Sequence, residues 1–106
     1  MDYVNHFESM HQVYNSTERL NHIYSVMGPV SPIAHCKDIR VRPGLVLHIE
    51  EAIPGEGEID MSTALKRWDE INPSGYMLLE HLENEQYPRA SASVRRICTE
   101  SDIQIH

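Results

Sequence analysis

Two short apolar runs of this chain end in side chains that can bind a metal ion or move a proton. Residues 33–38 read Ile-Ala-His-Cys-Lys-Asp and place His35 behind two apolar residues. Residues 77–81 read Met-Leu-Leu-Glu-His and place Glu80 behind three. Parallel α/β barrels build their active sites from side chains at the C-terminal ends of strands. The two runs therefore predict two strands whose ends form one site.

The two leading candidates also have structural interpretations. A histidine at a strand end, taken alone, is more often held by a hydrogen bond than by a metal, so His35 could be structural. An unpaired carboxylate beside a core is costly, and Glu80 could therefore pair with Arg40 or Arg42. Both interpretations stay open on the residues alone.

Three further polar residues lie beside the candidates. Lys37 and Asp38 could contact substrate, but they could also pair with each other or cap the next loop. His81 is expected beside the ligands or in a loop, and not as a ligand itself. Residues 54–57, Pro-Gly-Glu-Gly, predict a turn between a strand and a helix and do not by themselves indicate phosphate binding.

The elements that must position these side chains alternate between helix and strand. Apolar residues recur at helical spacing up to Met27, behind Asn15 and Glu18, which have the spacing of a capping box. The remaining patterns predict strands over 30–36 and 76–80, a short strand over 45–49, and helices over 61–71 and from Pro88 onward. This order is typical of a βα series entered part-way through.

Composition sets the class of protein. The chain has 106 residues and can bury one modest core with 41% hydrophobic residues. Its net charge of −7 disfavours nucleic acid as a partner, because that affinity depends on lysine and arginine at phosphates. No apolar run approaches the roughly 20 residues of a membrane span, and no signal peptide is recognised. Cys36 and Cys98 form no metal or disulfide motif. We expect a cytoplasmic protein with two reduced thiols.

Five short motifs, in order along nearly the whole chain, resemble the xylose isomerase-like TIM barrel family of sugar phosphate isomerases and epimerases. Residues 2–5 (Asp-Tyr-Val-Asn) resemble the Asp-Pro-Val-Asn that closes the sixth strand, with Tyr3 in place of proline. Residues 35–38 and 79–82 resemble the His-x-Lys-Asp and Leu-Glu-His at the ends of strands seven and eight. Residues 54–60 resemble the Pro-Gly-x-Gly loop, and Asn21-His22 a common pair in the preceding helix.

The resemblance implies one α/β domain over residues 1–106, formed by the C-terminal part, about three βα units, of a TIM (β/α)8 barrel. It implies that Asp2, His35 and Glu80 bind a divalent metal, Mn²⁺, Mg²⁺, Co²⁺ or Zn²⁺. The substrate would be a sugar or sugar phosphate, and the metal would stabilise an enediolate during proton transfer. Glu80 would also act as one acid/base carboxylate. The family's fourth ligand, a glutamate of strand four that is the other acid/base group, has no counterpart in this chain.

A closed barrel takes about 250 residues and leaves no strand edge unpaired. We therefore expect a truncated product or fragment that is inactive and poorly stable alone, or a chain that self-associates through exposed sheet edges. One alternative is a non-catalytic remnant or interaction domain. Another, which the charge of −7 disfavours, is an endonuclease-type metal hydrolase of the same barrel superfamily.

Overall fold

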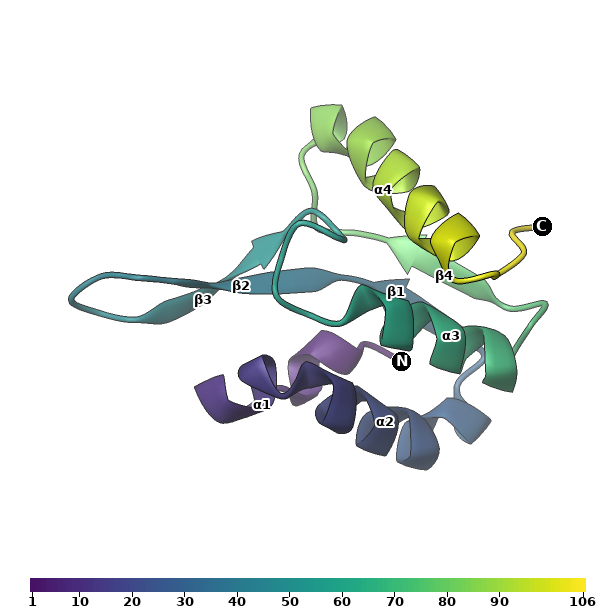
Figure 1. The fold of residues 1–106 in the computed structure, drawn as a ribbon, viewed down its shortest axis with the longest axis horizontal. Coiled ribbons are helices and arrows are strands. Elements are labelled where there is room, and N and C mark those ends of the chain that lie inside the picture. Colours follow the sequence, from purple (N-terminus) through teal and green to yellow (C-terminus); the bar gives the residue numbers. More distant parts are fainter.

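The centre of the structure is a pair of parallel strands, β1 (Ile33–Cys36) and β4 (Tyr76–Leu79). The computed structural model describes residues 1–106, and it is an α/β domain with four helices (Figure 1). Register places His35 opposite Leu78 and Cys36 opposite Leu79, so both strands end at the same edge of the sheet. β1 is shorter than the predicted strand over 30–36, because residues 28–30, which include Gly28 and Pro29, form a 3-10 helix before it.

The N-terminal segment continues this parallel arrangement on the other edge of β1. The amide of His35 donates to the carbonyl of Met1 at 2.9 Å, and the amino group of Met1 donates to the carbonyl of Ile33 at 2.5 Å. This alternation is the pattern of a parallel ladder. Three neighbouring segments therefore run in one direction, with β1 between Met1 and β4.

Three helices, α2 (Ser16–Met27), α3 (Met61–Ile71) and α4 (Tyr87–Glu100), follow one another along the sheet (Figure 1). The sequence predicted all three from their periodicity. Ala34 and Cys36 of β1 are buried in the same core cluster as residues of α2, α3 and α4. The buried residues of that cluster are Tyr3, Val13, Leu20, Ile23, Tyr24, Ala34, Cys36, Ile39, Ile59, Met61, Ala64, Leu65, Trp68 and Cys98.

The opposite face of the sheet has no covering layer. Ile33, Tyr76 and Leu78 point away from the core, and Tyr76 is 72% exposed. Alternate residues of a strand lie on opposite faces, so the same geometry that buries Ala34 and Cys36 exposes this row. The chain thus presents an apolar sheet surface to solvent.

The start of α2 differs from the expected capping box. Asn15 lies at the N-cap position, but its side chain donates to the carbonyl of His11 at 2.8 Å and makes no cap hydrogen bond. The reason is a short helix not foreseen from the sequence, α1 (Met10–Tyr14), which has Ser9 as its N-cap and Asn15 as its C-cap. The side-chain amide of Asn15 therefore donates its hydrogen bond to α1, the helix that precedes it, and not to the first turn of α2.

A hairpin of β2 (Asp38–Arg42) and β3 (His48–Ala52) follows β1 directly and extends away from the helices (Figure 1). The predicted strand over 45–49 is mostly wrong, since residues 45–47 form the hairpin turn and only residues 48 and 49 are in β3. Leu45, Val46 and Leu47 at this turn are exposed. This apolar run is therefore an exposed turn and not a buried strand.

Asp38 fixes the loop that leads into α3. Its buried carboxylate accepts hydrogen bonds from the amides of Gly55 at 2.9 Å, Gly57 at 2.8 Å and Ile59 at 3.1 Å, and from that of Ile39 at 2.8 Å. Gly55 has φ +88°, and a Cβ on Gly57 would collide with the Asp38 carboxylate. Burial raises the pKa of the Asp38 carboxyl more than these hydrogen bonds lower it. Asp38 therefore caps the loop before α3, which is one of the roles that the sequence left open for it.

None of the helices has the length and apolarity needed to cross a membrane.

Candidate functional site

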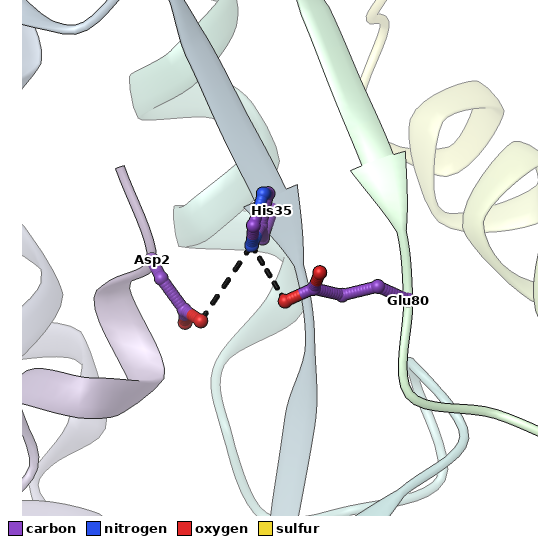
Figure 2. Close-up of side chains that lie close together, drawn as sticks. All are labelled: Asp2, His35 and Glu80. Carbon is purple, nitrogen blue, oxygen red and sulfur yellow. Dashed lines mark ion pairs between the residues drawn. The ribbon is translucent and has the colours of Figure 1, made fainter.

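Asp2, His35 and Glu80 converge at the edge where the three parallel segments end (Figure 2). Nδ1 of His35 lies 2.6 Å from Oε1 of Glu80 and 3.6 Å from Oδ2 of Asp2. All three side chains are partly buried, and one ligand atom from each lies within 4.8 Å of the others. The structure thus brings together the three residues that the sequence analysis gave as metal ligands.

Two polar atoms in this cluster have no hydrogen-bond partner. They are Oδ1 of Asp2 and Nδ1 of His35, and both are buried. The His35 nitrogen faces the Glu80 carboxylate, but the pair does not satisfy hydrogen-bond geometry. Buried polar atoms without a hydrogen-bond partner are costly, so these two atoms require an explanation. Asp2, His35 and Glu80 thus form a group that could hold a metal ion, with two of its polar atoms making no hydrogen bond.

Lys37 occupies the centre of the carboxylate pair. Its side chain is only 5% exposed, and Nζ lies 2.7 Å from Oδ2 of Asp2 and 2.7 Å from Oε1 of Glu80. The suggested pairing of Glu80 with an arginine is therefore wrong, because Arg40 and Arg42 both bind Glu50. The suggested pairing of Lys37 with Asp38 is also wrong, since Asp38 binds the loop amides.

His81 and Glu51 extend the polar cluster on the side of the hairpin. Nδ1 of His81 lies 3.1 Å from Nζ of Lys37 and 2.9 Å from Oε1 of Glu51. His81 has φ +57°, a left-handed conformation that is uncommon for residues other than glycine. Glu51 was not identified from the sequence. Only the antiparallel pairing of β2 with β3 brings it here, and no local motif signals that.

Tyr3 fastens the N-terminal segment under this site. Its hydroxyl is fully buried, donates to the carbonyl of Lys37 at 2.6 Å and accepts from the Lys37 amide at 3.0 Å. Burial holds the pKa of Tyr3 well above its usual value, so the hydroxyl stays protonated. In the sequence Tyr3 is notable only as a departure from proline, but its side chain binds the backbone of Lys37 and so positions Asp2 relative to Lys37.

The carboxylates of Asp2 and Glu80 and the ammonium group of Lys37 stabilise one another in their charged forms. Burial raises the pKa of Asp2, but the hydrogen bond and charge of Lys37 outweigh it and leave the pKa below its usual value. The Lys37 hydrogen bond is the largest cause of the lowered pKa of Glu80. Burial lowers the pKa of Lys37, and its bonds to the two carboxylates raise it by more. At neutral pH the site contains two carboxylates and one ammonium group.

Comparison of the chain with protein-family models, with curated proteins and with solved structures finds no match.

Proposed function

We propose that this chain is a sugar isomerase or epimerase-like protein of the xylose isomerase-like barrel class that binds a divalent metal at Asp2, His35 and Glu80. One observation carries the proposal. Three metal-ligand side chains from three neighbouring parallel segments meet at one edge, with two of their polar atoms unpartnered. Enzymes with parallel barrels place their catalytic groups at this edge.

The donor set fits a borderline-hard divalent ion. Two carboxylates and one imidazole suit Mn²⁺, Mg²⁺, Co²⁺ or Zn²⁺ better than a soft metal, which prefers sulfur. Oδ1 of Asp2 and Nδ1 of His35 make no hydrogen bond, while Lys37 contacts the other oxygen of Asp2. When bound, the metal would supply Lewis-acid polarisation of a carbonyl and its neighbouring hydroxyl. A fourth protein ligand would have to come from outside these three segments.

Glu80 is the group suited to move a proton. Its carboxyl has a lowered pKa, chiefly because Lys37 donates a hydrogen bond to it, so it is ionised and able to accept a proton at neutral pH. Lys37 would stabilise the charge of the ionised carboxylate. One carboxylate can remove a proton and return it to the same face of a carbon, whereas epimerisation needs a second group on the opposite face.

The arrangement of the elements supports the barrel class. Met1, β1 and β4 are parallel neighbours in the order expected for the sixth, seventh and eighth strands. Helices α2, α3 and α4 cover one face, as the outer helices of a barrel do, and the other face of the sheet is apolar and exposed. That open face also supports self-association, or pairing with a complementary chain, as part of the proposal.

The second candidate function is a non-catalytic interaction domain. It is favoured by Lys37, whose ammonium group already contacts both carboxylates and could make the cluster a purely structural ion-pair network. The exposed apolar row of the sheet would then be the functional surface. The two candidates differ in whether the cluster binds a metal.

Metal titration separates the two candidates. Calorimetry should give one saturable Mn²⁺ site on the wild-type chain, weakened tenfold or more by His35→Ala and by Glu80→Gln, because each removes a ligand. His22→Ala and Glu85→Gln alter exposed residues of the same types elsewhere and should bind as the wild type does. Absence of saturable Mn²⁺, Co²⁺ and Zn²⁺ binding would favour the interaction domain.

Isomerase chemistry has its own assay. The chain alone should not isomerise or epimerise a sugar, in line with the expected inactivity, because the second acid/base carboxylate is missing. In D2O with Mn²⁺, Glu80 should still catalyse the half-reaction, which is exchange of the proton next to the carbonyl of a ketose for deuterium. Glu80→Gln should abolish the exchange, and Glu85→Gln should not. Exchange that survives Glu80→Gln would remove this residue from the proposed role.

A further inference from the structure

The β2–β3 hairpin ends in an apolar tip that no other part of the chain covers. Leu45, Val46 and Leu47 form this hairpin tip, and their exposed fractions are 108%, 78% and 59%. The hairpin extends away from the helices, so the tip is remote from the core of its own chain (Figure 1). Exposed apolar side chains that cluster in this way mark a surface that binds another apolar surface.

The residues that flank the hairpin tip are basic. Arg42 ends β2, His48 begins β3, and residues 41–49 contain no acidic residue. Arg40 and Arg42 share the single carboxylate of Glu50, at 2.9 Å and 3.1 Å, so these three side chains keep a net positive charge. The chain as a whole has a net charge of −7. A surface complementary to this end of the hairpin is therefore apolar with an acidic margin.

The open face of the sheet has both properties. It carries an apolar row, and at the carboxyl edge of the strands the row meets an acidic margin. Three carboxylates of this margin lie 2.7 Å, 2.7 Å and 3.9 Å from the single ammonium group of Lys37, and they belong to Asp2, Glu80 and Glu51. The margin therefore has a net negative charge. The apolar row consists of Ile33, Tyr76 and Leu78.

The order of apolar and charged residues also matches between the two surfaces. The hairpin continues beyond the carboxyl edge of β1, with Arg42 and His48 nearer its own sheet and the tip farther out (Figure 1). A second copy that approaches from the opposite direction would place its tip on the apolar row, and its Arg42 and His48 over the acidic margin. Because each chain has one tip and one row, a two-fold dimer fills both rows with both tips.

We propose that the apolar row binds the hairpin tip of a second copy of this chain. This contact covers both exposed apolar surfaces at once. A lipid surface would cover the tip and leave the row exposed, and pairing of two open faces would leave both tips exposed. The inference deepens the proposed function, because it names the occupant for the self-association included there, and it needs no metal ion.

Complementary variants of the full chain test the contact by sedimentation velocity in EDTA, with one variant carrying a fluorescent label. The wild type should form a dimer. Val46→Glu in the tip and Tyr76→Lys in the row should each raise the dissociation constant of the dimer by about tenfold or more, because each places a charge in an apolar contact. When the two variants are mixed, they should form a one-to-one dimer at a concentration where each alone is monomeric. The Tyr76→Lys chain retains its tip and the Val46→Glu chain retains its row, and the two introduced charges attract each other.

Val30→Glu and Tyr14→Lys are the matched controls. Their side chains are 81% and 63% exposed, comparable with Val46 and Tyr76, but they lie on other elements of the chain. Both variants should dimerise as the wild type does.

Three results would overturn the proposal. They are a wild-type chain that stays monomeric at millimolar concentration, a Val46→Glu chain that dimerises as the wild type does, and a mixture of the two variants that stays monomeric. A monomeric wild type that floats with phosphatidylcholine vesicles would assign the tip to a lipid surface instead.

Failure of this contact is distinguishable from failure of the metal proposal. Saturable Mn²⁺ binding by a chain that forms no mixed dimer would keep the metal centre and remove the contact. A mixed dimer of chains that bind no Mn²⁺ would keep the contact and remove the metal centre.

Discussion

Replacement of Lys37 by methionine removes the one cation between two carboxylates and tests whether the cluster prefers a metal ion. Ligand atoms of Asp2 and Glu80 lie within 4.8 Å of each other. At an effective dielectric constant of about 20, two unit charges at that distance repel by about 3.5 kcal/mol. The side chains of Asp2 and Glu80 are 17% and 28% exposed, so solvent screens part of this repulsion.

We therefore expect Lys37→Met to lower the free energy of unfolding by roughly 2 to 3 kcal/mol in EDTA. Mn²⁺ should restore more stability to the variant than to the wild type, because the ion would relieve the carboxylate repulsion without competing with an ammonium group. Through linkage, the Kd of the Lys37→Met variant for Mn²⁺ should be about tenfold lower than that of the wild type. Urea unfolding with and without MnCl2 measures both effects.

Lys66→Met is the matched control, since Lys66 is an exposed lysine of α3 outside the cluster. It should change neither stability in EDTA nor the response to Mn²⁺. A destabilised Lys37→Met that gains nothing from Mn²⁺ beyond this control would refute the metal interpretation. A Lys37→Met chain as stable as the wild type would refute the electrostatic reasoning itself.

Further predictions concern stability, pH and association. Gly57→Ala should lower the free energy of unfolding by roughly 2 to 4 kcal/mol in urea titrations, because its Cβ would collide with the carboxylate that binds the loop amides. The lowered pKa values of Asp2 and Glu80 contribute stability above their usual values of 3.8 and 4.5 that is lost as the pH falls through the folded-state values. The raised pKa of Lys37 contributes stability below 10.5 that is lost as the pH rises through its folded-state value, so the difference from Lys37→Met should be largest near neutral pH. Tyr76→Lys, on the exposed sheet face, should reduce self-association in sedimentation velocity, and an equally associated variant would exclude that face.

Local patterns predicted much of the fold. The helix expected over 61–71 coincides with α3. β1 ends at Cys36 as expected, and β4 ends at Leu79, one residue before the end expected from the sequence. The reason is that hydrophobic periodicity, and the Gly and Pro residues that end helices, depend only on residues a few positions apart in the sequence. The same reasoning failed at residues 45–47, where an apolar run forms an exposed turn, because period alone does not distinguish a strand from a hydrophobic surface.

The contacts that complete the site depend on distant segments. Glu51 reaches the cluster through antiparallel pairing of β2 with β3, and Tyr3 does so through hydrogen bonds to residue 37. The central position of Lys37 between the two carboxylates follows from three segments separated by up to 78 positions, Asp2 to Glu80. No spacing along the chain encodes such an arrangement. Asp2, His35 and Glu80 could therefore be named from the sequence as residues that meet at one site, but the position of Lys37 between the carboxylates and the supporting contacts could not.

The most direct measurement is anomalous diffraction from crystals of the chain soaked in MnCl2. We expect one anomalous peak in contact with Asp2, His35 and Glu80, with Nδ1 of His35 and Oδ1 of Asp2 as ligands, and no peak at this position in His35→Ala crystals. A wild-type cluster with no anomalous density, and with Lys37 still bound to both carboxylates, would contradict the metal centre.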